Sequence, residues 1–269
     1  MNKIKRTLEA LWIIAKKPRL LNLILEDNNV WKNKVAAKYH LPNGLPQIQV
    51  NELFPNFSEE LNSFSFLGGG SLPTDIALLK SLCRTKENCT YFEIGTWRGE
   101  SVCNVADVAK ECYTLNLSKQ QIRALGESEA YANAHAYFSK DLPNVTHLEG
   151  DSRTFDYKAL NKKFDVVFID GDHRFSYVKS DTQKVFQYLL HENSIVVWHD
   201  YAYSPEEVRF EVFNAILDGV PKEYHSNLYH VANTLCAIFI KGNFKTETPT
   251  EPVLPNFTYH INLKMKPVR

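Results

Sequence analysis

The sequence predicts an α/β protein built on a parallel sheet, and three observations support this fold class. Short apolar segments of strand-forming residues alternate with segments of helical periodicity from residue 76 to residue 218. A glycine-punctuated turn follows the strand expected at residues 90–94. The chain has 269 residues, which is enough for one large domain with an extension. Alternation of this kind places helices on both faces of a parallel sheet.

The expected elements follow one another in a regular order. A helix from Ile76 to Arg84 comes first, with Thr74 or Asp75 as its cap, after the turn 68–70. That turn is either a cover for a bound ligand or a surface hinge. Two late strands without an intervening helix favour an antiparallel hairpin at one edge. The order is strand 90–94, helix 100–110, strand 112–117, helix 119–139, strand 145–149, helix 156–161, strand 164–169, helix 175–190, strand 194–198, helix 205–218, and strands near 223–231 and 234–241.

The segments on either side of this alternation have a different character. Residues 1–67 are expected to form an N-terminal helical extension and linker, residues 68–241 the main domain, and residues 242–269 a C-terminal tail. The first 28 residues predict two short helices broken at Pro18, with basic residues flanking an apolar face that continues through Ile24 and Leu25. A basic amphipathic helix can lie on an anionic membrane, but we expect docking on the protein's own domain or on a dimer mate.

Composition excludes several classes of partner and compartment. Thirty-one basic and 31 acidic residues cancel, so no overall field attracts nucleic acid, and a small molecule is the expected partner. Five cysteines without a C-x-x-C pair indicate a reducing, cytoplasmic compartment. The apolar run from Ala10 to Ala15 is too short to span a bilayer.

The turn after the first strand has the geometry of a cofactor site. Gly95 and Gly99 allow a close approach of backbone to a ligand, and the amides at the start of the next helix face the turn. Their spacing departs from the G-x-G-x-x-G dinucleotide fingerprint and lacks the Gly-Lys-Ser/Thr of a phosphate loop. An NAD-dependent Rossmann-like enzyme therefore remains only an alternative.

Polar residues follow each of the five parallel strands. Because the carboxyl ends of parallel strands meet at one rim of a sheet, these residues are expected to form one site. They are Glu93, Gly95 and Thr96 after the first strand, Asn116 after the second, Asp151 and Ser152 after the third, Asp170 to His173 after the fourth, and His199 to Tyr201 after the fifth.

Two motifs in this order resemble those of a known family. The pattern Glu-Ile-Gly-Thr-x-x-Gly-x-Ser at residues 93–101 resembles the first motif of class I S-adenosylmethionine-dependent methyltransferases. Residues 164–173, with Phe-Ile-Asp-Gly-Asp-His, and residues 196–201 resemble its metal-associated branch, related to sugar and macrolide O-methyltransferases and cephalosporin-hydroxylase-like proteins. The resemblance covers residues 68–240. It implies a Rossmann-like, doubly wound, seven-stranded sheet of order 3-2-1-4-5-7-6 with the last strand antiparallel.

The resemblance also implies which residues bind S-adenosylmethionine. Glu93 would hold the cofactor's amino group through water, and Asp151 would accept from the adenine amino group. Asn116 stands where the family has an acidic residue for the ribose, and an amide loses the charge-assisted bond. Either S-adenosylmethionine binds more weakly, or Asn116 makes no contact and the ribose has another partner. The expected cofactor residues are Glu93, Gly95, Thr96, Gly99, Ser101, Asn116, Asp151, Ser152 and Asp170.

Catalytic and metal residues are expected at the ends of the fourth and fifth strands. The resemblance implies a divalent metal, Mg²⁺ or Mn²⁺, held by Asp170, His199 and Asp200, although His199 suits Mn²⁺, Fe²⁺ or Zn²⁺ better than Mg²⁺. Alternatively, Asp170 caps a turn and Asp200 bonds to backbone. His173 is the expected base because imidazole titrates near neutrality, and His199 is the second candidate; Asp170 completes the expected catalytic group. Its alternative role is to pin one of the two aspartates.

The expected activity follows from these assignments. The chain is expected to be an S-adenosylmethionine-dependent methyltransferase that O-methylates a small hydroxylated metabolite such as a sugar. Arg174, Tyr177, Tyr201 and Tyr203 are expected to line the acceptor side. A non-catalytic adenosylmethionine-binding or scaffold protein is the alternative from another functional class, and a homo-oligomer is compatible with either.

Overall fold

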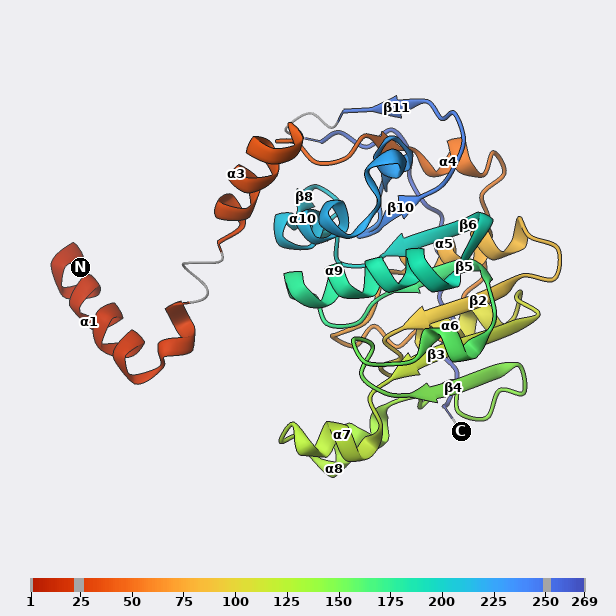
Figure 1. The fold of residues 1–269 in the computed structure, drawn as a ribbon, viewed down its shortest axis with the longest axis horizontal. Coiled ribbons are helices and arrows are strands. Elements are labelled where there is room, and N and C mark those ends of the chain that lie inside the picture. Colours follow the sequence, from red (N-terminus) through yellow and green to blue (C-terminus); the bar gives the residue numbers. More distant parts are fainter. Residues whose placement is uncertain (1, 22–26, 249–252, 269) are drawn as a thin grey trace.

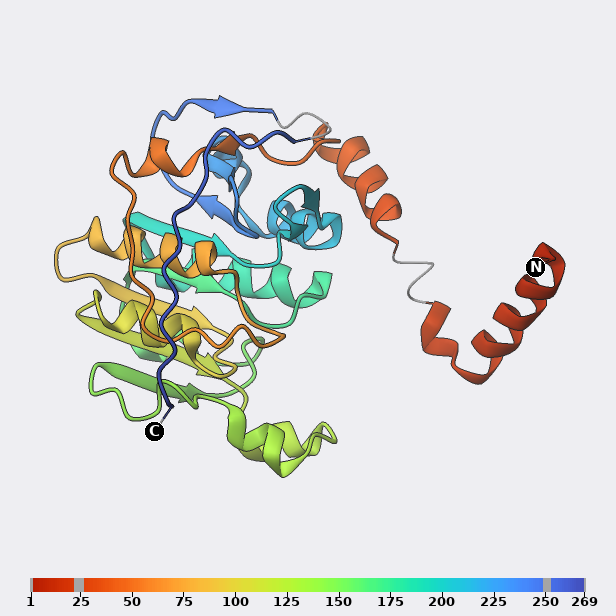
Figure 2. The same ribbon diagram turned by 180° about the vertical axis from the view of Figure 1, so that it is seen from behind.

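The computed structural model describes residues 2–21, 27–248 and 253–268. Within them, one sheet of nine strands runs through the molecule and helices cover both of its faces (Figures 1 and 2). Seven of these strands form the central part, in the spatial order β4-β3-β2-β5-β6-β10-β9. Their bounds are β2 Thr90–Ile94, β3 Glu111–Asn116, β4 Val145–Glu149, β5 Phe164–Ile169, β6 Leu190–Trp198, β9 Leu228–Val231 and β10 Ala237–Phe239.

The expected topology is confirmed. Numbered along the chain, the seven central strands read 3-2-1-4-5-7-6 across the sheet. Strands β4, β3, β2, β5 and β6 pair in parallel, whereas β10 pairs antiparallel with both β6 and β9. Two short strands extend the sheet beyond β9. They are β1, Gln47–Ile48, which pairs parallel to β9, and β11, Thr246–Glu247, which pairs antiparallel to β1.

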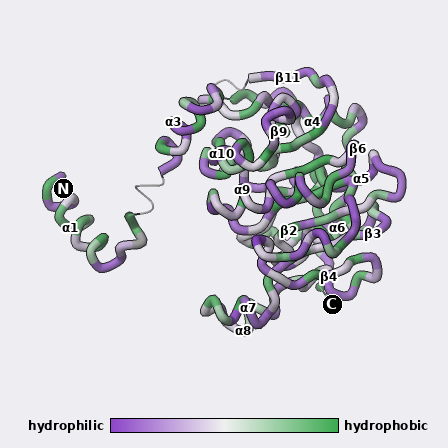
Figure 3. Tube along the Cα trace, viewed as in Figure 1, coloured by the Kyte–Doolittle hydropathy of each residue, from purple (hydrophilic) through white to green (hydrophobic). Residues whose placement is uncertain are grey.

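Two apolar layers hold the helices against the sheet. Val167 and Phe168, neighbours in β5, are both fully buried and belong to opposite layers. Strands buried on both faces read as continuous apolar runs, which explains the sequence of β5 and β6. One layer includes α9, Phe175–Lys184, and α10, Phe210–Gly219; the other includes α5, Pro73–Arg84, and α6, Glu100–Ala106. Figure 3 shows the hydrophobic segments gathered in this part of the molecule.

Several helices differ from the expected ones. The helix expected at 119–139 is two short helices, α7 (Lys119–Ala124) and α8 (Glu129–Ala134), and Gly126 between them has a φ of 90°. The segment 156–161 forms only a 3₁₀ turn, η2 (Tyr157–Leu160). Glycine and residues that bond to local backbone end these segments before a long helix forms.

The later helices also begin or end elsewhere. Helix α9 ends at Lys184 and continues as one π turn, η3 (Val185–Leu189), before β6 begins at Leu190. The residues before α10 form a small hairpin of β7 (Ala202–Ser204) and β8 (Glu207–Val208). A 3₁₀ segment, η4 (Lys222–Asn227), precedes β9.

The described part of the N-terminal segment contains α-helices that the sequence patterns did not predict, the longest of them α3 (Asn28–Tyr39). Helix α1 (Lys3–Lys16) ends before Pro18, as expected, and a 3₁₀ turn, η1 (Pro18–Leu21), follows. The predicted apolar positions Ile24 and Leu25 lie outside the described residues. The apolar residues of α3 are not gathered on one face. A one-turn helix, α4 (Val50–Leu53), follows β1.

Helix α3 packs on the domain. The Tyr39 hydroxyl donates to Asp218 of α10 at 2.5 Å, and the Trp31 ring stacks on Phe175 of α9 with 5.2 Å between centroids. Val35 is fully buried. Residues 253–268 run as an extended segment along the α5 side of the molecule (Figure 2), where the Tyr259 ring lies edge-on to Phe57. In the described ranges, no helix has the length and apolar character needed to cross a bilayer.

Candidate active site

The carboxyl ends of β2 to β6 meet at one rim of the sheet, on the side of α7 and α8 in Figure 1. All of the site residues expected from the strand ends lie at this rim. A small, open pocket lies beside the turn after β2. Residues 69–71 and 96–101 line it together with Ile76 and Asp170. The glycine-rich turn before α5 therefore faces the turn after β2 across this pocket.

The glycines after β2 are required by the protein's own packing. Gly95 has a φ of 96° and Gly99 a φ of 81°, in the left-handed region that favours glycine. A Cβ on Gly95 would come closer than 3.0 Å to the backbone carbonyl of Asp170, a distance that real Cβ atoms essentially never show. A Cβ on Gly99 would meet the Ser139 hydroxyl equally closely. Packing within the protein and the left-handed backbone thus already account for glycine at both positions.

Glu93 lies fully buried behind this turn. Its carboxyl group accepts hydrogen bonds from the hydroxyls of Tyr91 (2.9 Å), Ser101 (2.6 Å) and Thr114 (3.0 Å). Burial raises the pKa of Glu93 to about 8, although these three donors oppose the rise. Thr96 is also buried, and its hydroxyl is hydrogen-bonded to that of Thr114. The network fixes the first turn of α6 to the end of β2.

The ends of β3 and β4 carry the residues expected to contact adenosine. Asn116 is partly buried, and its amide donates to the Leu117 carbonyl at 3.1 Å. Asp151 is paired with Arg153 at 2.9 Å, and the hydrogen bond from Arg153 lowers the pKa of Asp151. Ser152 is partly buried beside it. No sequence pattern pointed to Arg153 as the partner of this carboxylate.

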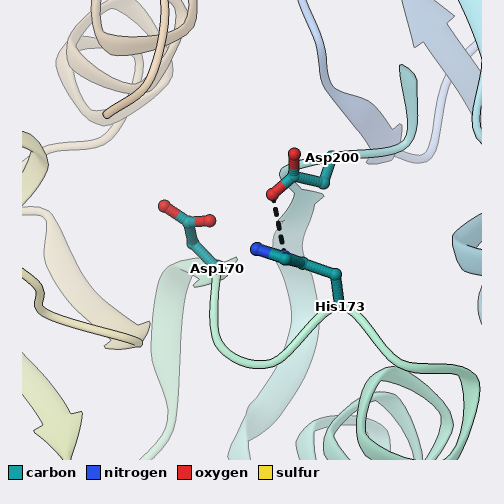
Figure 4. A group of neighbouring side chains, drawn as sticks. All are labelled: Asp170, His173 and Asp200. Atoms are coloured by element: carbon teal, nitrogen blue, oxygen red, sulfur yellow. Dashed lines mark ion pairs between the residues drawn. The ribbon is translucent and has the colours of Figure 1, made fainter. Parts of the chain in front are cut away.

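Asp170, His173 and Asp200 form a cluster at the ends of β5 and β6 (Figure 4). One potential ligand atom of each lies within 4.8 Å of the others. His173 Nδ1 is 2.8 Å from Asp200 Oδ2, and the imidazole lies between the two carboxylates. Burial opposes the charged form of His173, but the hydrogen bond and charge of Asp200 raise its pKa above the ordinary value. The His173 side chain is 44% exposed, so its ring remains accessible.

His199 is buried and enclosed by three carboxylates, and the group of potential metal ligands at this rim contains His173 in its place. Its Nδ1 lies 3.1 Å from Asp170 Oδ1 and 3.0 Å from Asp200 Oδ2, and its Nε2 lies 3.2 Å from Asp75 Oδ2. Burial opposes its charge, but the three aspartates raise the pKa of His199 well above the ordinary value. The carboxylates of Asp170, Asp200 and Asp75 thus face both nitrogens of the His199 ring. The metal site was expected to consist of Asp170, His199 and Asp200. In the structure it is His173 that offers a potential ligand atom together with the two aspartates.

Asp75 is the site residue that sequence reasoning did not place. It is fully buried at the start of α5 and accepts from the Leu72 amide at 2.7 Å and the Leu235 amide at 2.8 Å. The prediction that the helix begins at Ile76 with Thr74 or Asp75 as its cap is wrong, because α5 begins at Pro73 with Leu72 as the N-cap residue; the Asp75 carboxylate, inside the first turn, accepts from the Leu72 amide. Its contact with His199 joins residues 124 positions apart, and the only local signal was an acid in the first turn of a helix.

The residues expected on the acceptor side divide into two groups. Arg174 pairs with Asp172 at 2.5 Å, and its guanidinium lies over the Tyr177 ring. Tyr203 is 53% exposed. The prediction that Tyr201 lines the acceptor side is wrong, because its ring is fully buried and its hydroxyl accepts from the Leu45 amide at 2.8 Å. Tyr201 anchors the segment before β1 to the core.

Known proteins resemble this chain over its central part. Residues 92–201, which are 110 of the 269, match the family model of a methyltransferase domain. An uncharacterized protein of Acanthamoeba polyphaga mimivirus is 28% identical over 137 residues, 48% of this chain and 61% of that protein. The match thus spans less than two thirds of the relative's length.

Solved structures of methyltransferases also match this chain, at low sequence identity and with TM-scores below 0.5. A TDP-rhamnose 3′-O-methyltransferase of calicheamicin biosynthesis has a TM-score of 0.45 at 15% identity, covering 63% of this chain and 80% of its own. An O-methyltransferase from Bacillus cereus in complex with SAH has a TM-score of 0.42 at 14% identity, and the match covers 65% of this chain and 84% of that one. The SAH-bound Podospora anserina methyltransferase has a TM-score of 0.40 at 16% identity, and the match covers 68% of this chain and 100% of that one.

The matched residues run from Phe92 in β2 to Tyr201 after β6 and include both motifs. Residues 92–201 of this chain are thus similar to a methyltransferase domain.

Proposed function

We propose that this chain transfers the methyl group of S-adenosylmethionine to a hydroxyl group of a small metabolite, such as a sugar. One observation carries the proposal: Asp170 lines the pocket beside the glycine turn and also belongs to the cluster with His173 and Asp200. A methyl donor in that pocket would lie next to an accessible base. The proposed methyltransferase unit comprises residues 68–241, with residues 1–67 as an extension and residues 242–269 as a tail.

The proposed reaction asks little of the protein beyond alignment and proton removal. Asp200 holds the Nδ1 proton of His173, which leaves Nε2 of the neutral ring to take the proton from the acceptor hydroxyl. When bound, S-adenosylmethionine would supply the methyl group to this oxygen, and its sulfur would leave with the bonding electrons. His199 acts as a positioning residue, because its ring orients the carboxylates of Asp170 and Asp200.

The proposed cofactor contacts follow the strand ends. Residues 95–99 would lie along the methionine part of the cofactor, and Asp151 would accept from the adenine amino group. Asn116 would bind one ribose hydroxyl. The Glu93 contact would run through water, since its carboxyl is buried behind Ser101. The polar side chains of Asp170, Asp172 and Arg174 suit a hydroxyl-rich acceptor, because each can bond to sugar hydroxyls.

A divalent cation fits the cluster in a second version of this proposal. Asp170, His173 and Asp200 offer two carboxylates and one imidazole, a donor set that suits Mn²⁺ better than Mg²⁺. When bound, the cation would orient the acceptor oxygen and lower its pKa. His173 cannot be both a ligand and the base, so a chelator separates the two versions. Activity that survives EDTA supports His173 as base, and activity restored by Mn²⁺ supports the cation.

The first experiment is calorimetric titration with S-adenosylmethionine, followed by a methyl-transfer assay over hydroxylated metabolites that include nucleotide sugars. We expect binding and turnover, and NAD is expected to give no thermal stabilisation. Binding without turnover on any acceptor would favour a non-catalytic adenosylmethionine-binding protein. Stabilisation by NAD alone would favour a different Rossmann-like enzyme.

The second experiment tests the base. His173→Gln is expected to reduce kcat by about a hundredfold or more with little change in cofactor affinity. His191→Gln is the matched control, because His191 also pairs with a carboxylate, Asp165, at 3.2 Å, but near the amino ends of β5 and β6. The control is expected to keep full activity. Equal effects of the two substitutions would refute the role of His173.

A further inference from the structure

We propose that α1 binds the surface of an anionic lipid bilayer and lies parallel to it. This inference concerns where the protein works and is independent of its proposed chemistry. The helix has an exposed apolar stripe, a strong excess of positive charge, and no buried side chain within Lys3–Lys16, all of whose residues are described. Each of these three observations bears on the identity of the partner.

The apolar stripe follows the helical repeat. Ile4, Leu8, Leu11 and Ala15 recur at spacings of three and four residues, so they lie on one face, and Trp12 lies at its edge. The exposed fractions are 69% for Ile4, 62% for Leu8, 58% for Leu11 and 61% for Trp12. Figure 3 shows hydrophobic and hydrophilic residues alternating along this helix, which is drawn apart from the sheet.

The charges on the rest of the helix indicate an anionic partner. Five basic residues and one acidic residue, Glu9, lie between residues 2 and 17, a net charge of four positive units. The basic residues are Lys3, Lys5, Arg6, Lys16 and Lys17. The whole chain has a net charge of zero, so this excess is local. Lysine and arginine beside an apolar stripe that includes tryptophan are typical of helices that lie in a bilayer interface.

Helix α3 packs on the protein's own domain, whereas α1 has no buried residue. Helix α3 buries Val35 completely and makes hydrogen bonds to Asp218 and Val208. By contrast, every side chain of α1 except that of Ile14, which is partly buried, is exposed. The expectation that the basic amphipathic helix docks on its own domain is therefore not met by α1.

Pairing with a second copy of α1 is disfavoured by its charge distribution. Basic residues lie at both ends of the helix, with Glu9 between them. In a parallel pair the two Lys5 and Arg6 segments would face each other, and in an antiparallel pair they would face Lys16 and Lys17. Like charges repel in both arrangements. An anionic surface attracts both ends at once.

The dimensions fit a helix in the interface rather than across the membrane. Fourteen residues span about 21 Å at 1.5 Å per residue, which is shorter than a bilayer core of about 30 Å. The Lys16 ammonium lies 3.5 Å from the Trp12 ring centroid, which places a cation beside the aromatic residue at the edge of the stripe. Lysine and tryptophan together suit the headgroup region.

The test is co-sedimentation of the full chain with vesicles of phosphatidylcholine alone and of phosphatidylcholine mixed with phosphatidylglycerol. We expect affinity for the mixed vesicles at least about tenfold higher than for the neutral ones, because each basic residue near an anionic surface contributes about fivefold. Binding is expected to weaken between about 0.1 M and about 1 M salt, where the Debye length falls from about 10 to about 3 Å. Equal binding to both vesicles, or none to either, would overturn the proposal.

Matched variants locate the binding surface. Leu8→Glu with Leu11→Glu should reduce vesicle affinity at least about tenfold. The control, Leu125→Glu with Leu263→Glu, changes residues that are 71% and 70% exposed elsewhere and should leave vesicle affinity unchanged. The four leucines are all exposed, so thermal unfolding serves as the check that each variant is folded. If the control pair lowers affinity as much as the α1 pair, α1 is not the membrane-binding element.

Charge variants and hydrodynamics complete the test. Lys3→Gln with Lys5→Gln should reduce affinity for mixed vesicles by about 25-fold, whereas the exposed pair Lys140→Gln with Lys222→Gln should not. Analytical ultracentrifugation without lipid separates the remaining alternative. A dimer that Leu8→Glu with Leu11→Glu dissociates would assign the stripe to a second copy of the chain and overturn the proposal.

Discussion

Substitution of Gly95 by alanine tests how the rim of the sheet is built. The backbone carbonyl of Asp170 occupies the space where the new Cβ would lie, and a backbone atom cannot move aside as a flexible side chain can. Asp170 also donates its amide to the Ile94 carbonyl at 2.8 Å, so the two strand ends are tied together at this point. The substitution must therefore separate the end of β2 from the end of β5.

The expected loss of stability has two parts. An alanine with φ near 96° costs about 1–2 kcal/mol relative to glycine. Overpacking against a fixed neighbour costs about 1–3 kcal/mol more. The free energy of unfolding should fall by about 2–5 kcal/mol, and the melting temperature should fall by about 2–4 °C for each kcal/mol.

Gly126→Ala provides the matched control for this measurement. Gly126 has a φ of 90°, but a Cβ added there would have no heavy atom of the described residues within 4 Å, apart from its own chain neighbours. The control therefore carries the backbone cost of about 1–2 kcal/mol without the clash. Urea unfolding of both variants gives the difference, which isolates the contact with Asp170. Methyl transfer should also fall more in Gly95→Ala, because Asp170 moves with its carbonyl.

Equal destabilisation by the two substitutions would refute this reasoning. That result would mean that the β5 end adapts to a Cβ at no cost, and that the left-handed φ alone accounts for glycine at position 95. Gly95→Ala with normal stability and lost cofactor binding would instead assign the glycine to the cofactor.

Three further predictions concern the ionisable groups Glu93, Asp75 and His173. Burial raises the pKa of Glu93 from 4.5 to about 8, so the folded state holds its proton more tightly. Stability should fall as pH rises between these values, by at most about 1.4 kcal/mol per pH unit, and Glu93→Gln should remove that slope in urea unfolding at several pH values. Asp75→Asn leaves the charged His199 without its Nε2 partner and should cost about 3–5 kcal/mol by urea unfolding; an unchanged midpoint would contradict the buried ion pair. The turnover of the wild type should rise with pH through a value above 6.5, since Asp200 raises the pKa of His173 and only the neutral ring accepts a proton; a flat pH profile would argue against this base.

The core of the fold was predictable from local patterns. The strands at 90–94, 145–149 and 164–169 have the bounds expected from the sequence. The strands at 90–94 and 164–169 lie inside the sheet and are mostly apolar, because both of their faces are buried. The position of the site followed from the same patterns, since the carboxyl ends of parallel strands share one rim. Asp170, His173 and Asp200 were selected in this way and do lie together.

The partners of the buried groups depend on contacts between distant parts of the chain. Asp75 and His199 are both ordinary polar residues in their local sequence, and only the packing of α5 against the end of β6 makes them a buried pair. The burial of Tyr201 and the docking of α3 likewise depend on neighbours that are remote in sequence. Periodicity shows which face of an element is apolar, but burial and pKa depend on what the rest of the chain places against that face.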